Sequence, residues 1–404
     1  MNKLCLVTII FFVSLAAKGD YWTQMASFGG TARFGCFYFS IGTKGYIGSG
    51  STSYQPYNFV NDFWEYDVNT NSWSQKANFP GPGRYGAIDF SIGTKGYVGT
   101  GWNQVTPLLN DFWQYDQATN SWSQKNNFPG VPRQGGIGLV INNKAYAGLG
   151  HTGNSYLGDF LLYNDTTDTW TQVASFTGTP RSSAIGFKLN NKIYIGCGVI
   201  TYPAFNLTND FWEYDPLLNS WSQKASFPAS SRYSMGYFSI NNYGYCGLGK
   251  DSSNSFSFPE FFKYDPVLNN WSQVLNCPVT SINGGFTIGN KGYLGCGLSS
   301  SLIISNQFWQ YTPDSTTGTT EQASADSKFT VSPNPATDFI ICSLGFIPKE
   351  KTTLHVFNAA GREVSSIPLN SADTKLQTSN FAKGVYTIHI TSNTITATQK
   401  FVKQ

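Results

Sequence analysis

The chain has 404 residues, enough for one large domain and a second, small one, each with its own core. Only 12% of the residues are charged and the formal net charge is +3, which argues against a nucleic-acid partner. Aromatic residues make up 16% of the chain and there are 41 glycines, a balance typical of turn-rich β-proteins rather than of helical or disordered chains.

Residues 1–19 have the layout of a secretory signal peptide. One Lys precedes an apolar run from Leu4 to Leu15, and small residues follow between Ala16 and Gly19. This run is too short to span a membrane, and no run of comparable length follows it. The sequence therefore predicts an exported protein without a transmembrane segment.

Three short patterns recur between residues 20 and 312 with a period of about fifty residues. An aromatic–glycine pattern such as GYIGSG begins at Gly45, Gly96, Ala145, Ile193, Gly244 and Gly292. A pattern such as DFWEYD begins at Asp62, Asp111, Asp159, Asp210, Glu260 and Gln307. A Trp, in most copies followed by Ser-Gln, stands at Trp22, Trp73, Trp122, Trp170, Trp221 and Trp271.

A period of this length, with several short strands in each unit, is typical of propeller blades. In the copy that begins at Arg84, we expect strand A in RYGAIDFSI, B in KGYVGTG, C in DFWQYD and D in SWSQK. There are six B and six C strands, but only five D strands follow a C strand. The sixth D strand is YWTQMASF, near the mature N-terminus, so the sequence predicts a six-bladed, all-β propeller closed by pairing of this segment with QFWQYT.

The spacing in YDVNTNSW, where the Tyr stands seven positions ahead of the Trp, resembles the kelch repeat, as does the glycine-rich B strand. The resemblance covers residues 20–312, although the adjacent glycines of the kelch consensus appear here as Gly-x-Gly. It implies a kelch-type β-propeller, which we expect to be monomeric, and by itself it says little about ligand or activity.

Residues 313–327 are polar and are predicted to form a linker, and residues 328–404 are predicted to form a small Ig-like β-sandwich. This last segment resembles the type A C-terminal sorting domain of the type IX secretion system, a feature of Bacteroidetes. The resemblance implies a partner in the type IX secretion machinery and a protein that is secreted or attached to the cell surface. An ordinary accessory Ig-like module is the alternative. The matching residues are Pro333, Asn334, Pro335, Gly361, Arg362, Gly384 and Tyr386.

The loops between strands B and C differ from copy to copy, whereas the A–B and C–D turns are short and alike. Variable loops on a constant scaffold are typical of a binding face. Aromatic residues in these loops could bind sugar rings or a protein, or could fold inward and fill their own loops. They are Tyr54, Tyr57, Trp102, Tyr156, Tyr202 and Phe205.

Five A strands are preceded by an Arg on the same face, and the sixth copy has Ser281 instead. Two interpretations are open. The guanidinium groups could ring the channel mouth and hold a carboxylate or sulfate, or each could pair with a carboxylate or backbone carbonyl of the neighbouring blade and fix the spacing of the blades. The five residues are Arg33, Arg84, Arg133, Arg181 and Arg232.

The residue inventory argues against several enzyme classes. The kelch-type copper enzyme galactose oxidase needs two His ligands and a Tyr cross-linked to Cys, but His151 is the single His of the propeller region, so no metal or cofactor is expected. The sequence boxes of six-bladed sialidases are absent, and a Ser-His-Asp triad has no basis. Asp89 is the one acid within an A strand and could act as a channel-facing acid or base. No catalytic residue is assigned.

Three functional hypotheses remain. The first is an exported binding module that recognises a glycan or a protein through the B–C face. The second is a carbohydrate-active enzyme of sialic-acid mutarotase or lyase type that uses the Arg ring, and the third is a structural adhesion or surface-layer component. The cysteines after residue 19 occupy slots that are apolar or small in other copies, so we expect mostly free, buried thiols.

Overall fold

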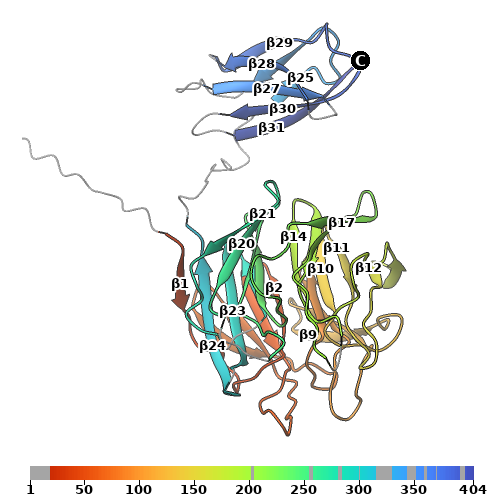
Figure 1. Cartoon of the computed structure of the whole chain (residues 1–404), viewed down its shortest axis with the longest axis vertical. Coiled ribbons are helices and arrows are strands. Elements are labelled where there is room, and N and C mark those ends of the chain that lie inside the picture. Colours follow the sequence, from red (N-terminus) through yellow and green to blue (C-terminus); the bar gives the residue numbers. More distant parts are fainter. Residues whose placement is uncertain are drawn as a thin grey trace, which may run out of the picture. The chain divides into compact units, whose positions relative to one another are not determined.

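The computed structural model describes residues 19–201, 204–253, 258–280, 284–299, 301–314, 330–343, 352–358, 362–369, 371–391 and 396–404. The predicted signal peptide, most of the predicted linker, Tyr202, Ser281 and Gly361 lie outside these residues. The chain forms two compact units, of which one comprises Asp20–Pro313 and the other includes Asp314–Gln404 (Figure 1). The described residues contain β-strands and no helix, and so none that could span a membrane.

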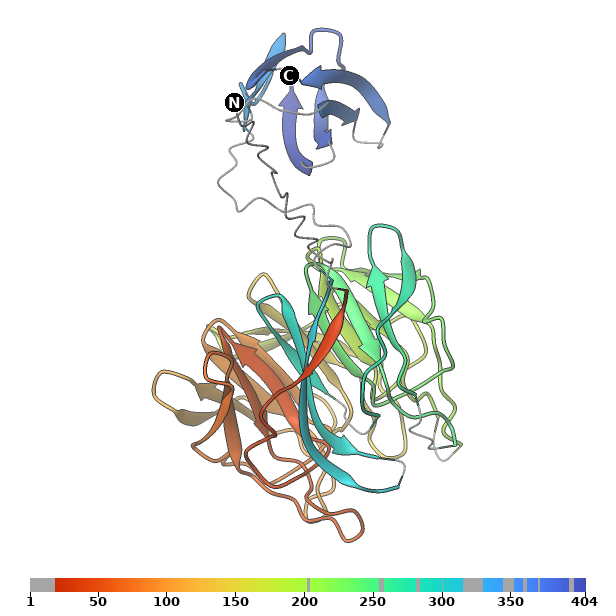
Figure 2. The same cartoon turned by 90° about the vertical axis from the view of Figure 1, so that its left-hand side faces the viewer.

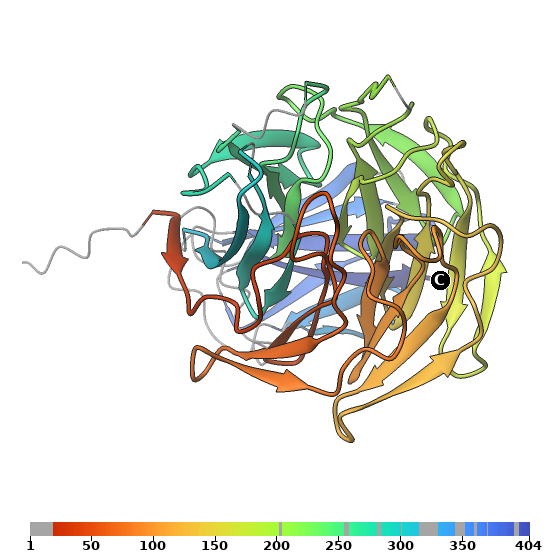
Figure 3. The same cartoon turned by 90° about the horizontal axis from the view of Figure 1, so that it is seen from below.

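The larger unit consists of six four-stranded antiparallel sheets arranged around a central axis (Figure 3). Blade 1 contains β2 (Phe37–Ile41), β3 (Lys44–Gly48), β4 (Phe63–Asp67) and β5 (Ser72–Lys76). Blade 2 contains β6 (Ile88–Ile92), β7 (Lys95–Gly99), β8 (Phe112–Asp116) and β9 (Ser121–Lys125). Blade 3 contains β10 (Ile137–Ile141), β11 (Lys144–Gly148), β12 (Phe160–Asn164) and β13 (Thr169–Gln172).

Blades 4 and 5 repeat this order of strands A to D. Blade 4 contains β14 (Ile185–Leu189), β15 (Lys192–Gly196), β16 (Phe211–Asp215) and β17 (Ser220–Lys224). Blade 5 contains β18 (Gly236–Ile240), β19 (Tyr243–Gly247), β20 (Phe261–Asp265) and β21 (Asn270–Val274).

Blade 6 is assembled from both ends of the propeller sequence. Its A, B and C strands are β22 (Gly285–Ile288), β23 (Lys291–Leu298) and β24 (Ile304–Thr312), and its D strand is β1 (Tyr21–Gln24). Tyr21 pairs with Thr312 and Gln24 with Trp309, and Figure 2 shows β1 in red beside the cyan β24. The predicted six-bladed fold with N-terminal closure is therefore confirmed. Closure also removes two free sheet edges.

The A strands line the axis, since each contacts the A strand of the next blade in a closed circle, β22 against β2 included. On β6, Ile88, Phe90 and Ile92 are buried between blades, whereas the alternate residues Asp89 and Ser91 remain partly accessible. This alternation is the two-residue period of a strand, with one face toward the blade core and the other toward the channel.

The core between blades is aromatic and repeats around the ring. The Tyr of each C strand packs against the Trp of the D strand, as Tyr66 does against Trp73 at 5.1 Å between ring centroids. Glycines in the B strands allow this packing. A Cβ at Gly45 or Gly96 would lie within about 2.3 Å of a Phe ring of the neighbouring blade, Phe286 or Phe39.

The smaller unit is a sandwich of two antiparallel sheets. One consists of β25 (Thr330–Ser332), β26 (Phe339–Ser343) and β29 (Asp373–Gln377). The other has the order β28 (Glu363–Leu369), β27 (Thr352–Asn358), β30 (Gly384–Thr391) and β31 (Thr396–Lys403). Ile340, Leu354, Val356, Ile388 and Phe401 form the centre of its core. The predicted Ig-like β-sandwich is confirmed.

Candidate functional site

The repeated arginines lie in buried ion pairs. Arg84 is fully buried, and its Nη1 and Nη2 atoms donate to the two Asp111 oxygens at 2.5 and 2.7 Å. Its Nη1 also donates to the carbonyl of Thr100, and the guanidinium lies 4.8 Å from the centre of the Phe79 ring. The same arrangement joins Arg33 to Asp62, Arg133 to Asp159 and Arg181 to Asp210, and Arg232 contacts Glu260 at 3.2 Å.

These pairs explain the DFW pattern of the sequence. In blades 1 to 5 the acid before the C strand binds the Arg and the Phe enters the core. In blades 1, 2 and 4 the Trp indole also donates to this acid, as Trp64 does to Asp62 at 2.7 Å. Burial alone would raise the pKa of Asp62, but the hydrogen bonds from Arg33 and Trp64 outweigh burial and hold that pKa below its ordinary value. The guanidinium groups thus pair with acids, as in the second interpretation, but each acid belongs to the blade of its own Arg and not to the neighbouring blade.

The residue after each Arg lies at the mouth of the ring, by which we mean the end of the central channel on the side of the B–C loops. It forms an isolated β-bridge with the residue that follows the Gly-x-Gly pattern of the same blade. This extends each A–B pair toward the loops and fixes two side chains per blade at the mouth. The bridged pairs are Phe34 with Ser51, Tyr85 with Trp102, Gln134 with His151, Ser182 with Val199, and Tyr233 with Lys250.

An aromatic cluster covers the mouth at blades 1 and 2. Tyr57 of the blade 1 loop contacts Trp102 of blade 2 at 5.6 Å and nearly perpendicular, and Trp102 lies 5.2 Å from Tyr85. Tyr54 contacts Tyr57 at 5.6 Å and remains 38% exposed, while Tyr57 and Trp102 are half-buried. We define the aromatic cluster as Phe34, Tyr54, Tyr57, Phe59, Tyr85 and Trp102.

The predicted aromatic residues of blades 3 and 4 extend this surface. Tyr156 packs against His151 at 5.5 Å, and Phe205, with a left-handed φ of 46°, lies 6.1 Å from Tyr233. Burial lowers the pKa of His151, and its Nδ1 accepts a hydrogen bond from the Gly153 N–H at 3.1 Å, so the imidazole is neutral near pH 7. The structure therefore brings Tyr54, Tyr57 and Trp102 into one cluster and places Tyr156 and Phe205 beside other mouth residues.

Tyr233 and Lys250 form the bridged pair of blade 5 at the mouth. Burial raises the pKa of Tyr233 to about 12, and the negative charges of Tyr54, Asp251 and Tyr156 contribute less. The ammonium group of Lys250 lies 5.9 Å from the Tyr233 ring, and burial lowers its pKa to about 8.

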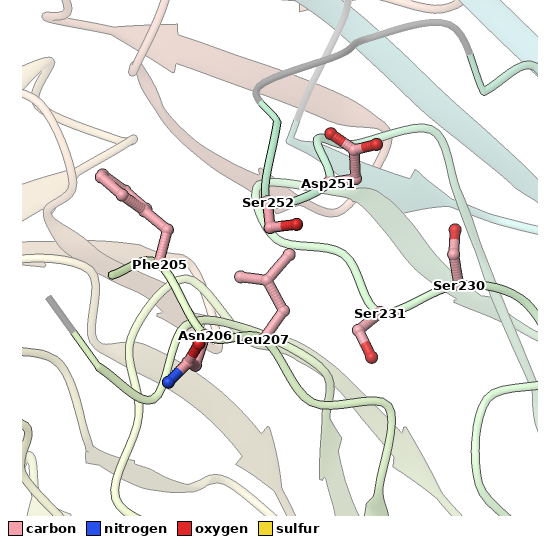
Figure 4. Close-up of a pocket in the computed structure, with 7 residues that line it drawn as sticks. All are labelled: Phe205, Asn206, Leu207, Ser230, Ser231, Asp251 and Ser252. Atoms are coloured by element: carbon pink, nitrogen blue, oxygen red, sulfur yellow. The ribbon is translucent and has the colours of Figure 1, made fainter. Parts of the chain in front are cut away.

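A cavity of about 500 Å³ opens between blades 4 and 5 on the same side (Figure 4). Its wall comes from the B–C loops of both blades and from the connection between them. The lining includes the phenyl ring of Phe205, the isobutyl group of Leu207, the amide of Asn206 and the carboxylate of Asp251. Three hydroxyl groups come from Ser230, Ser231 and Ser252.

Asp89 is the one acidic residue on the described A strands, and it faces the channel. Burial raises the pKa of its carboxyl to about 8, against a weaker opposing effect from a hydrogen bond with the Tyr38 backbone. The phenol groups of Tyr38 and Tyr237 interact electrostatically with it. Asp89 is thus largely protonated at neutral pH while remaining in contact with solvent in the channel.

The six described cysteines are buried and unbridged, which confirms the expectation of free thiols. Cys36 of blade 1 and Cys296 of blade 6 lie close enough for each thiol to shift the pKa of the other. Within the described residues, no group of three His, Cys, Asp or Glu side chains is placed to hold a metal ion.

The sorting-motif residues tie the smaller unit to its C-terminal strand. The Asn334 Oδ1 accepts a hydrogen bond from the Val402 N–H at 2.9 Å, between the cis prolines Pro333 and Pro335. Tyr386 stacks on Phe401 at 5.4 Å, and its hydroxyl donates to the Ala382 carbonyl. Gly384 has a positive φ, and the Arg362 N–H donates to Asn358 at the turn after β27.

Comparisons with known proteins agree with this architecture. Residues 14–198 match the KLHDC2/KLHL20/DRC7 Kelch-repeats domain, and residues 330–404 match the Secretion system C-terminal sorting domain. The chain thus combines a β-propeller, the first part of which matches a kelch-repeat domain, with a C-terminal unit that matches the sorting domain of the type IX secretion system. The sorting domain supports export, followed by secretion or attachment at the cell surface.

A solved structure described as "Structure of YjhT" has a similar fold, with a TM-score of 0.60 and 14% identity. The match covers 70% of this chain and 95% of that chain. At this identity the likeness concerns the fold alone. A search of curated proteins gave no match.

Several mouth residues were missed by sequence reasoning. Phe34, Tyr85 and Tyr233 each follow a repeated Arg, and that position alone could have placed them at the start of an A strand and hence at the mouth. Asp251 and the serines of the cavity carry no such signal, because the cavity forms between loops of different blades.

Proposed function

We propose that this exported kelch propeller is a binding module that recognises a glycan through the mouth on its B–C side. The aromatic cluster is the observation that carries the proposal. Half-exposed Tyr and Trp rings at different tilts give flat apolar faces with polar edges, which suit the alternating CH and OH surfaces of sugar rings. The cluster spans two blades, so it exists only where blades 1 and 2 pack against each other.

The charge of the site favours binding over the enzymatic hypothesis. A mutarotase or lyase that acts on acidic sugars would need guanidinium groups at the mouth. Four of the five repeated arginines make bidentate hydrogen bonds to an Asp carboxylate, and the fifth contacts Glu260. Their positive charges are therefore already compensated. The described mouth offers aromatic and hydroxyl groups in greater number than cations.

Trp102→Ala and Tyr57→Ala, made in the full chain, test the proposal. We expect each to weaken binding on a glycan array by about tenfold or more, because stacked rings contribute much of the affinity at such sites. The melting temperature should stay within about 2 °C of the parent, because both rings are partly exposed. Leu217→Ser, on an exposed C–D turn, is the matched control and should bind as the parent does.

Two results would contradict the proposal. One is that no glycan binds to the parent chain while a protein partner does. The other is glycan binding that survives in Trp102→Ala and Tyr57→Ala alike, since the ligand would then lie elsewhere.

A further inference from the structure

The cavity between blades 4 and 5 is a concave surface on the mouth side. Phe205, Asn206 and Leu207 come from the blade 4 loop, whereas Asp251 and Ser252 come from the blade 5 loop. A volume of about 500 Å³ lies within the range of small-ligand sites. One or two sugar rings would fill it.

The cavity and the aromatic cluster lie on the same side of the propeller, since both are built from B–C loops. Phe205 on the cavity wall contacts Tyr233, which follows the repeated Arg232 at the mouth. We expect a chain-like ligand to lie on the aromatic cluster and to place one end in the cavity.

The carboxylate in the cavity is held by its own loop. The Asp251 Oδ1 accepts hydrogen bonds from the Ser253 N–H at 2.9 Å and from the Ser253 hydroxyl at 2.7 Å. This Asx turn fixes the direction of the side chain before a ligand arrives. The carboxylate of Asp251, the serine hydroxyls and the phenyl ring of Phe205 line one cavity, in which Asp251 and Phe205 lie apart (Figure 4). Carboxylate and hydroxyl groups can bond sugar hydroxyls, while the ring can pack on the apolar face of a sugar.

The charge of the cavity selects against anions. The described residues of its lining include the Asp251 carboxylate and no Lys or Arg. The nearest guanidinium, Arg232, donates to the Ser230 hydroxyl at 3.3 Å but is buried and contacts Glu260. Lys250 precedes Asp251 in the chain but is not part of the lining, and its ammonium group lies over the Tyr233 ring.

We propose that the cavity between blades 4 and 5 binds the terminal unit of an uncharged oligosaccharide and rejects sugars that carry a carboxylate. This rests on the proposed function, since it assigns the ligand class and one subsite of the same mouth. Neutral sugar hydroxyls donate to Asp251, whereas a uronic or sialic carboxylate would face a fixed like charge.

The test compares neutral hexose oligosaccharides of two to six units with uronic-acid oligosaccharides of the same lengths, using the full chain and isothermal titration. We expect the neutral series to bind at least about tenfold more tightly, with affinity rising with chain length as both the cavity and the aromatic cluster are covered. Asp251→Asn keeps the Oδ1 that forms the Asx turn and removes the charge. It should reduce the preference for neutral ligands to about threefold or less.

The outcomes separate this inference from the proposed function. If Trp102→Ala abolishes binding but acidic sugars bind as tightly as neutral ones, or Asp251→Asn leaves the preference unchanged, the inference is wrong and the proposed function stands. If neither series binds, both are wrong. Ser231→Ala, which removes one cavity hydroxyl and no charge, is the control and should weaken neutral ligands without changing the preference.

Discussion

The two sides of the propeller differ in what their side chains contact. On the C–D side, each turn places an Asn or Asp with a left-handed φ at the same position, where its Oδ1 accepts a hydrogen bond from the Tyr of its own blade. Asn219, for example, accepts from the Tyr214 hydroxyl and from the Ala174 N–H of the preceding blade, both at 2.8 Å. On the B–C side, the loops differ in length and sequence, and their aromatic residues contact one another rather than a repeated partner.

This difference separates residues that assemble the ring from residues available to a ligand. Asp20, two positions before Trp22 in β1, accepts from the Tyr311 hydroxyl at 2.7 Å and so repeats the Asn219 contact in the closing blade. The repeated positions therefore serve assembly even where the blade is built from both ends of the propeller sequence. We infer that substitutions on the repeated network lower stability, whereas substitutions in the aromatic cluster lower binding.

The largest effect should come from the buried Arg–Asp pairs. Arg84→Met leaves the Asp111 carboxylate without its cation in a largely buried place, and we expect it to lower the free energy of unfolding by about 3 kcal/mol or more. Asp111→Asn should cost a similar amount, and the double variant less than the sum of the two. Urea unfolding monitored by Trp fluorescence measures all three.

The same variant also tests whether Arg84 serves assembly of the ring or ligand binding. If Arg84→Met retained the stability of the parent and lost only ligand binding, the guanidinium would belong to the binding site. The glycan preference of the folded variant should instead equal that of the parent, because the Arg84 side chain is fully buried.

The channel residue Asp89 should give a smaller, pH-dependent effect. The folded chain holds the proton of this carboxyl up to about pH 8, whereas the unfolded chain loses it near an ordinary Asp pKa of about 4. The contribution to stability is therefore fully present below about pH 4 and is lost as the pH rises through 8. Asp89→Asn removes this loss, so its advantage in melting temperature over the parent should grow between pH 5 and pH 9.

Ser91→Ala, at the next channel-facing position of β6, is the control and should follow the parent at every pH. Parallel curves for Asp89→Asn and the parent would mean that the carboxyl titrates normally. Asp89 has no counterpart in the other five blades, where this position is Tyr38, Gly138, Gly186, Tyr237 or Gly285. Asp89 thus occurs in one blade only, and ionisation of its carboxyl lowers stability as the pH rises. The residues of the repeated network stabilise the ring instead.

The fold could be predicted because the repeat fixes it. The period, the strand patterns and the displaced D strand determine both the number of blades and the closure by β1. The ends of the strands were predicted less accurately. The A strand predicted from Arg84 begins only at Ile88, because Arg84 to Gly86 form the ion pair, the bridge to Trp102 and a turn at Gly86 with a φ of 65°.

The direction of the arginines was left open by the sequence, yet a signal was present. The copy that lacks the Arg, with Ser281, is also the copy that lacks the acid, with Gln307. Arg and acid thus vary together among the six copies, which indicates that they pair. The cavity had no comparable signal, since it depends on how two unrelated loops fold against each other.

The smallest predicted effect concerns a hydrogen bond that the D-strand Trp makes in blade 4 and lacks in blade 3. In blade 4 the Trp221 indole donates to the Ala174 carbonyl at 3.0 Å, but in blade 3 the buried Trp170 indole nitrogen has no partner among the described residues. The two rings are otherwise matched, since Trp221 lies 4.9 Å from Phe176 and Trp170 lies 4.8 Å from Phe128.

Replacing each Trp by Phe should therefore isolate the hydrogen bond. Both variants lose a similar ring area, but Trp221→Phe also loses a bond and leaves a carbonyl unpaired, so it should lower the free energy of unfolding by about 1 kcal/mol more than Trp170→Phe. Urea unfolding of the two variants measures this difference, and neither should alter glycan binding, because both residues lie on D strands outside the aromatic cluster. Equal losses would show that ring packing alone holds these positions. The repeated network would then depend on shape rather than on its hydrogen bonds.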